Sequence, residues 1–165
     1  MSAPTVDTSA VGAALPGAVI TIERGPVSVF ASAVKDDSDV YQSAEAANAA
    51  GFDNIPIPPT FPFAMVNWGQ FREQQPEGWD AMGPMAEVFG SLMRNGGLIL
   101  HGEQEFLYHA PVVVGDVLTM TGKVKDIYTK TSGEKTMTFV VSEQDYHNQR
   151  GEHVLTQVTT ILHRA

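Results

Sequence analysis

The chain has 165 residues, of which 43% are hydrophobic and 18% are charged, and this composition predicts one compact domain with a single core. Its formal net charge of −9 makes binding to nucleic acid or to an anionic membrane surface unfavourable, so neither partner is expected. The absence of cysteine excludes a disulfide framework, thiolate metal ligands and a cysteine nucleophile, and it favours a cytoplasmic location.

We expect no targeting or membrane signal in the N-terminal region. No apolar run in the chain approaches the ~20 residues that a membrane-spanning helix needs. The first residues also lack a basic start followed by a continuous apolar stretch, which a secretory signal would show. We therefore expect residues 1–15 to form a flexible tail and residues 16–165 to form a single domain.

Two short helices are predicted in the first third of the chain. Residues 25–34 carry apolar side chains at the i, i+3, i+4, i+7 spacing of a helix with one apolar face. A second, alanine-rich helix is expected over residues 43–50, with Ser43 as its N-cap and Gly51 at its end.

The stretch 55–60 (IPIPPT) contains three prolines, which remove backbone donors and fix φ, so it is predicted to be a rigid extended connector. After it, residues 61–68 are apolar almost all round, which indicates a helix buried on most sides. Residues 69–97 are expected to form an insertion, in which a polar loop precedes an amphipathic helix over residues 84–95.

From Leu98 onward the hydrophobic period changes to two residues, which is typical of strands with one buried face. Turn signals at 114–116, 132–133 and 148–151 divide this half into about four long antiparallel strands. Helices first and strands second define an α+β class, with one apolar helix available for a curved sheet to wrap around.

The usual motifs of metal, nucleotide and serine chemistry are missing from the sequence. None of the five histidines forms a His-x-x-x-His or His-Glu-x-x-His pair, so no metal site is expected. No Gly-x-Ser-x-Gly, Gly-x-Gly-x-x-Gly or phosphate loop occurs either, so a serine nucleophile and a nucleotide cofactor are not expected.

Two regions of the chain nevertheless share an ordered set of short motifs with a known family. The motifs are DSDVY (37–41), AANAAGF (46–52), IPPTF (57–61), HGEQEF (101–106), YHAP (108–111) and VGDVL (114–118). In this order and spacing the chain resembles the MaoC-like hydratases and dehydratases, and most closely their N-terminal, dehydratase-type branch. The likeness spans some 130 residues, from about Val29 to the C-terminus.

The resemblance implies a hot-dog fold, in which a curved antiparallel sheet wraps a long apolar helix, here assigned to residues 61–68. It implies a substrate that is an acyl thioester of coenzyme A or acyl carrier protein (acyl-CoA or acyl-ACP). Family members add water to a 2-enoyl group or remove it from a (3R)-hydroxyacyl group, and they need no cofactor. Hot-dog domains pair, so a homodimer or a heterodimer with a catalytic hot-dog subunit is expected.

The resemblance also shows which catalytic groups this chain lacks. Active R-specific hydratases use an Asp, a His five residues later and a backbone N–H from a His-Gly pair. Without gaps, the Asp falls on Asp37, the His on Gln42 and the His-Gly pair on Pro58 and Pro59. Glutamine cannot exchange a proton near neutral pH, and Pro59 has no N–H. This pattern is similar to that of the non-catalytic halves of heterodimeric dehydratases.

The candidate catalytic residues are Asp37 and His101. The alternative for Asp37 is a solvated carboxylate in a turn, and the alternative for His101 is a structural histidine at the end of a strand. Tyr41 either donates its hydroxyl to the site or packs on the core edge. The remaining candidate substrate-binding residues are Gln42, Pro59, Thr60, Met65, Gly102 and Glu103. The methionine-rich stripe of residues 85–93 is interpreted either as an acyl-chain lining or as ordinary core and dimer interface.

The leading hypothesis is a hydratase or dehydratase component that needs a catalytic hot-dog partner. A second hypothesis is a self-sufficient homodimer that uses His101 with Asp37 or Glu103 across an interface. A non-enzymatic acyl-CoA-binding module is the third. A thioesterase is the weakest, because such an enzyme needs a carboxylate on the central helix and residues 61–68 carry none.

Overall fold

The computed structural model describes residues 7–94, 96–133 and 135–164. Its α-helices are α1 (Arg24–Ala33), α2 (Ala44–Ala49), α3 (Pro62–Met65) and α4 (Pro84–Met93), and two 3₁₀ turns are η1 (Asp39–Tyr41) and η2 (Arg72–Gln74). The strands are β1 (Ala14–Thr21), β2 (Leu98–Tyr108), β3 (Val117–Ser132), β4 (Lys135–His147) and β5 (His153–Arg164).

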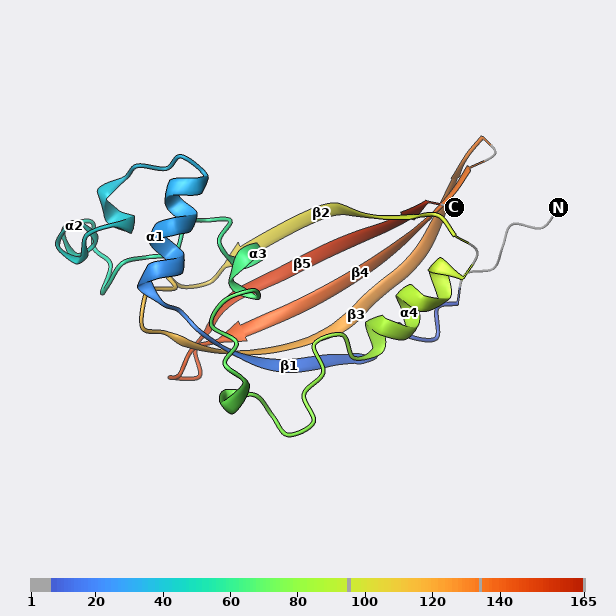
Figure 1. Cartoon of the computed structure of the whole chain (residues 1–165), viewed down its shortest axis with the longest axis horizontal. Helices are drawn as coiled ribbons and strands as arrows, with labels where there is room; N and C mark the ends of the chain where they lie inside the picture. Colours follow the sequence, from blue (N-terminus) through green and yellow to red (C-terminus); the bar gives the residue numbers. More distant parts are fainter. Residues whose placement is uncertain (1–6, 95, 134, 165) are drawn as a thin grey trace.

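The five strands form one antiparallel sheet in the order β1-β3-β4-β5-β2, and it curves as Figure 1 shows. Strands β3, β4 and β5 follow one another as a meander, and β2 reaches the far edge beside β5. The α+β class and the four long strands predicted from the period of two are therefore confirmed. Helices α3 and α4 lie over one face of the sheet, its inner face, and α1 lies at the end of the sheet that is closest to α3 (Figure 1).

Strand β1 was not predicted, and residues 14 and 15 belong to it rather than to a flexible tail. Its pairing with β3 shifts register between Leu15 and Ala18, where Pro16 and Gly17 interrupt the alternation that marks a strand. The preceding segment is also attached to the sheet, because the Gly12 N–H donates to the Val124 carbonyl oxygen at 2.8 Å. Residues 1–6 lie outside the described residues, so their prediction as a tail is untested.

The two short helices and the connector follow the prediction. Helix α1 buries Val27 and Ala31, and the Ser43 hydroxyl caps α2 by accepting the Ala46 N–H at 3.3 Å. The connector forms one isolated bridge, between Pro56 and Val113, and it ends in a turn at Pro59 and Thr60. Backbone hydrogen bonds hold the connector on both sides of this bridge. The Ile57 N–H donates one of them, and the Ile55 carbonyl oxygen accepts the other.

The prediction of a long buried helix over residues 61–68 is wrong. The helix α3 is a single turn, Pro62–Met65, and Phe63 and Trp68 are 51% and 41% exposed. Gly69 explains the early end, because it has a positive φ of 76° and its carbonyl oxygen accepts the Thr21 N–H at 2.8 Å. The chain is therefore fixed to the end of β1 before a second turn can pack on the sheet.

The amphipathic helix of the insertion is confirmed as α4, except for Asn95, which lies outside the described residues. Met85, Val88 and Leu92 of α4 pack on a small buried cluster of the sheet, formed by Val124, Ile127 and Val140. A larger cluster lies under α1 and α3 at the other end of the same face. Among the described residues, no helix is long and apolar enough to cross a membrane.

Candidate functional site

An apolar cleft of about 450 Å³ lies where the connector, η1 and the end of β2 meet, and we call it the connector cleft. Its lining residues are Val40, Tyr41, Phe52, Pro56, Ile57, Pro59, Tyr108, His109, Ala110, Pro111 and Val112. The prolines of the connector cannot offer N–H groups to the cleft, so its polar groups are few and come mainly from side chains. This composition suits a largely apolar ligand with a small number of hydrogen-bonding atoms.

Two tyrosines supply neutral hydroxyl groups at this cleft. The Tyr108 hydroxyl donates to the Pro59 carbonyl oxygen at 3.1 Å. Burial, and secondly the neighbouring Tyr41, raise the pKa of Tyr108 well above its usual value. Burial and then the charge of Asp36 also raise the pKa of Tyr41. Both groups therefore remain protonated donors and do not act as bases near neutral pH.

Gln42, at the position of the expected histidine, is turned toward α1 and does not line the cleft. Its Oε1 accepts the Ser28 hydroxyl at 2.5 Å, and its main-chain oxygen accepts from the Arg24 guanidinium at 2.8 Å. These two bonds hold the corner between α1 and α2. The residue therefore has a structural task here, and an amide has no proton to exchange near neutral pH.

The two candidate catalytic residues lie in different parts of the chain. Asp37 is exposed in the turn between α1 and η1. His101 is exposed near the start of β2, where its Nε2 is 3.2 Å from Gln104 Oε1 and its ring packs edge-on against Phe63. The rise of a strand places His101 about 20 Å along β2 from Tyr108 and the connector cleft. One chain thus provides no His101–Asp37 pair at the cleft.

The other predicted binding residues divide between the cleft, the core and the edge strand. Tyr41 and Pro59 line the cleft, whereas Met65 is 1% exposed and belongs to the core. Thr60 is exposed just before α3. Gly102 and Glu103 lie on exposed β2, beside an irregularity in its pairing with β5.

Sequence reasoning missed Tyr108 and His109, although both lie in the YHAP motif that supported the family resemblance. The position of His109 is set by Thr156, whose hydroxyl lies 3.1 Å from His109 Nε2 and donates to Asp145 at 2.7 Å. The His109 ring also lies 4.2 Å, centroid to centroid, from the ring of His153. Only the strand register brings these residues together, so a linear motif could not show the contact.

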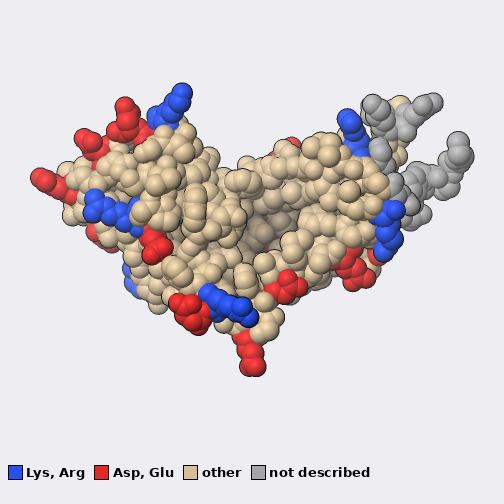
Figure 2. Space-filling model, viewed as in Figure 1, with Lys and Arg blue, Asp and Glu red and all other residues tan. Residues whose placement is uncertain are grey.

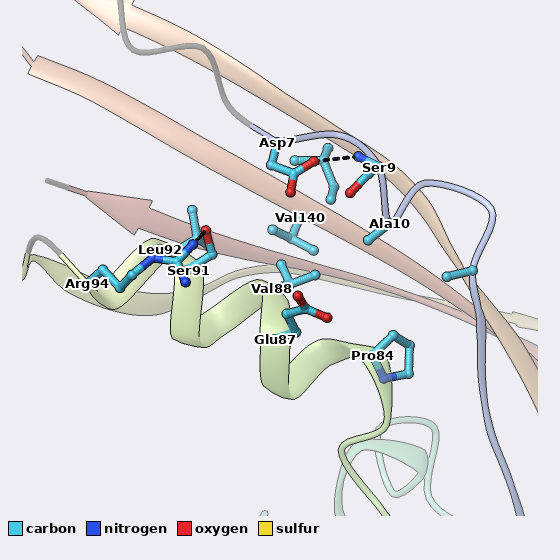
Figure 3. A pocket seen from close by; sticks show the side chains of 12 residues that line it. Asp7, Ser9, Ala10, Pro84, Glu87, Val88, Ser91, Leu92, Arg94 and Val140 are labelled. Carbon is cyan, nitrogen blue, oxygen red and sulfur yellow. Dashed lines mark hydrogen bonds between the residues drawn. The ribbon is translucent and has the colours of Figure 1, made fainter.

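A second cavity, of about 280 Å³, lies at the opposite end of the sheet under α4 (Figure 3). Its floor is apolar and includes Val88, Leu92 and Val140, while Asp7, Glu87 and Arg94 lie among its polar walls (Figure 3). It contains none of the single candidate residues for catalysis or substrate binding, but Val88 and Leu92 belong to the 85–93 stripe, for which an acyl-chain lining and ordinary core were the alternatives. Within the described residues, no group of three or more His, Asp or Glu side chains is arranged to hold a metal ion.

A curved antiparallel sheet of five strands in this order, with its helices on the inner face, is the hot-dog fold that the sequence predicted. The chain belongs to the family described as FAS1-like, dehydratase domain region, whose model matches residues 9–157. The resemblance to MaoC-like dehydratases is thereby confirmed.

Sequence relatives extend over most of the chain. A UPF0336 protein of Streptomyces avermitilis is 32% identical over 146 residues, which cover 87% of this chain and 85% of the relative. A UPF0336 protein of Streptomyces coelicolor is 31% identical over 163 residues, which cover 97% and 96%.

Solved structures show the same fold at lower identity. The HadBC (3R-hydroxyacyl-ACP dehydratase) complex of Mycobacterium tuberculosis matches with a TM-score of 0.67 and 23% identity, over 93% of this chain and 96% of that chain. The ChsH1-ChsH2 complex of the same organism matches with a TM-score of 0.70 and 19% identity, over 91% and 83%. The R-hydratase PhaJ1 of Pseudomonas aeruginosa matches with a TM-score of 0.57 and 18% identity, over 92% and 79%.

Proposed function

We propose that the chain is the substrate-binding component of a MaoC-like acyl-thioester hydratase or (3R)-hydroxyacyl dehydratase, and that it reaches full activity only with a catalytic hot-dog partner. The proposal depends on the residues found at two positions, 42 and 59, where the family resemblance expects catalytic groups. Gln42 is bonded to Ser28 of α1, and Pro59 has no N–H to donate.

The chemistry explains why these two positions decide the matter. Water must lose a proton as it attacks the 2-enoyl group, and the developing enolate oxygen must meet a preorganised donor. The amide at Gln42 cannot take that proton, and the Pro59 carbonyl oxygen is an acceptor that Tyr108 already occupies. Asp37 is retained, but among the described residues no hydrogen bond or ion pair joins it to a histidine, so the partner is proposed to supply the Asp and His pair.

The substrate part of the proposal rests on the connector cleft. Its apolar lining suits an acyl chain, and the protonated hydroxyl of Tyr41 suits a neutral thioester or amide oxygen, whereas the Tyr108 hydroxyl already donates to Pro59. The carrier is proposed to be coenzyme A or acyl carrier protein, and no cofactor takes part. The similarity to the HadBC (3R-hydroxyacyl-ACP dehydratase) complex supports the same substrate class.

The need for a partner is supported by the edge strand β2. Its outer edge pairs with no other strand among the described residues, and Leu98, Leu100 and Leu107 are 50%, 39% and 42% exposed. An exposed, apolar edge strand is a surface that proteins usually cover by pairing. Two of the similar structures, HadBC and ChsH1-ChsH2, are complexes, which agrees with pairing here.

The test is a hydration assay on a 2-enoyl-CoA with the purified chain alone, with the product of a neighbouring hot-dog gene alone, and with both. We expect the mixture to exceed the partner alone at least tenfold and the chain alone to be inactive. Substantial hydration by the chain alone would refute the need for a partner. Thioester binding without turnover in any mixture would instead show a non-enzymatic acyl-CoA-binding module.

The variant His101→Ala distinguishes the self-sufficient homodimer from the proposed component. His101 is exposed on the edge strand, so in a homodimer it would contact Asp37 or Glu103 of the second copy. A homodimeric enzyme loses turnover in this variant. The proposed component keeps its ability to activate the partner.

A further inference from the structure

The middle of the inner sheet face is left uncovered between α3 and α4. The larger apolar cluster lies under α1 and α3, the smaller one lies under α4, and no helix crosses the strands between them (Figure 1). Figure 2 shows a hollow at this place, and no Lys, Arg, Asp or Glu side chain lies in it in this view. The short α3 is the reason that this part of the sheet remains open.

The strand register identifies the residues on the floor of this hollow. On β4, Tyr146 belongs to the larger cluster and Val140 to the smaller one, so both point to the inner face. Ser142 and Gln144 lie between them at the same period of two. The pairing of β4 with β5, and of β5 with β2, sets further neutral side chains beside them. Together these residues form what we call the polar band: Gln104, Ser142, Gln144, Gln157 and Thr159.

Hydrogen bonds connect most of the polar band. The Tyr146 hydroxyl donates to Gln157 Oε1 at 3.1 Å, and Gln157 Nε2 lies 3.4 Å from Thr159 Oγ1. The Thr159 hydroxyl in turn donates to Gln104 Oε1 at 3.0 Å. A connected row of this kind holds its side chains in fixed positions.

Gln144 is the incomplete member of the polar band. Its Nε2 reaches Ser142 Oγ at 3.4 Å, but its Oε1 is buried and has no hydrogen-bond partner among the described residues. Gly122, opposite Gln144 on β3, leaves the space that the glutamine side chain occupies, because a Cβ there would lie 3.0 Å from Gln144 Cγ. An unpaired buried amide oxygen costs about 1–3 kcal/mol, so a donor from outside the chain would be stabilising. A half-turn about the last torsion of Gln144 exchanges Oε1 with Nε2, so either amide atom can occupy the unpaired position.

The chemistry of the polar band restricts its ligand. Ser142 and Gln157 are already buried, but a plain hydrocarbon laid on the half-buried Gln104, Gln144 and Thr159 would remove their water without replacing its hydrogen bonds, which is unfavourable. A charged group would find no fixed opposite charge, because the five side chains of the band are neutral and the ionisable group bonded to them is His101, whose Nε2 lies 3.2 Å from Gln104 Oε1. A neutral chain that bears a hydroxyl or oxo group can hydrogen-bond with the band and carries no charge.

We propose that the hollow binds the distal part of an acyl group that carries hydroxyl or oxo substituents, with the Gln144 amide as a hydrogen-bonding partner. This inference rests on the proposed thioester function, because the acyl chain would extend from the connector cleft. Tyr108 of that cleft is paired with Leu155 on β5, four residues before Thr159. The strand rise makes the distance to the polar band about 13 Å, within reach of a medium-length acyl chain.

The experiment compares the binding of dodecanoyl-CoA and 12-hydroxydodecanoyl-CoA to the full chain by titration calorimetry, with coenzyme A as the reference. We expect the hydroxylated thioester to bind about three- to tenfold more tightly, which corresponds to one or two net hydrogen bonds. Gln144→Leu should abolish this preference. Gln70→Leu, in the loop outside the polar band, should retain it.

The outcomes separate the two proposals. Equal binding of the two thioesters, or a preference that Gln144→Leu leaves unchanged, overturns the polar acyl site but not the thioester function. Failure of both thioesters to bind, alone and with the catalytic partner, overturns both. If Gln144→Leu does not fold, Ser142→Ala is used in its place, and it must reduce the preference at least twofold for the inference to stand.

Discussion

At the scale of single residues, Pro59 connects the observations on the connector cleft. Its ring leaves no N–H at the position that the family resemblance assigns to a catalytic donor, while its carbonyl oxygen accepts from Tyr108 and so joins the connector to β2. In the proposed function, the same residue thus lacks a catalytic donor and fixes the cleft wall. The sequence predicted the first effect, because proline chemistry is local. It could not show the second, because the partner lies 49 positions away.

Tyr108→Phe should destabilise the fold by about 0.5–1.5 kcal/mol, since it leaves the Pro59 carbonyl oxygen without its partner. Chemical denaturation monitored by circular dichroism measures this change. The matched control is Tyr41→Phe, because Tyr41 lines the same cleft but its hydroxyl makes no such bond within the described residues. A loss as large in Tyr41→Phe as in Tyr108→Phe would contradict the assigned role.

At the scale of elements, the sequence predicted those whose pattern is local and regular. Helix α4 and strands β2 to β5 show their period over ten or more residues. Strand β1 was missed because Pro16 and Gly17 sit at its register shift. The length of α3 was wrong because apolarity alone cannot show that the chain is pinned to β1 at Gly69. The polar band was invisible for a related reason, since its members come from three strands that only the register aligns.

Gly69→Ala should destabilise the fold by about 2–4 kcal/mol, because a Cβ at Gly69 would overlap the Thr21 carbonyl oxygen in addition to the cost of the positive φ. Gly78 offers a matched control with nearly the same φ, 72° against 76°, and open space around it. Gly78→Ala should therefore cost only about 1 kcal/mol. Thermal unfolding of both variants measures the difference, and equal losses would show that the contact with Thr21 is unimportant.

At the scale of the whole molecule, alkaline pH acts through the buried Tyr146. Burial raises the pKa of Tyr146 well above its usual value of 10.0, so the folded state keeps a proton that the unfolded state loses. The contribution to the free energy of unfolding is complete below about pH 10 and falls as the pH rises beyond it.

We expect the stability of the wild type to decrease above about pH 10 and that of Tyr146→Phe to decrease less steeply, although the variant starts lower because it loses the bond to Gln157. Urea denaturation between pH 8 and pH 11 measures both slopes. Tyr128→Phe, which alters a ring stacked on Phe139, serves as the control and should follow the wild type. Identical slopes for wild type and Tyr146→Phe would contradict the prediction.

The separation of the two apolar clusters also bears on how the molecule opens. Because amides and hydroxyls lie between them, the packing under α4 is not continuous with the packing under α1. Release of α4 would expose a small group of side chains and leave the larger group intact, so it is a local opening and not global unfolding. The two ends of the sheet are thus expected to exchange their amide hydrogens at different rates, with the faster rate at the α4 end.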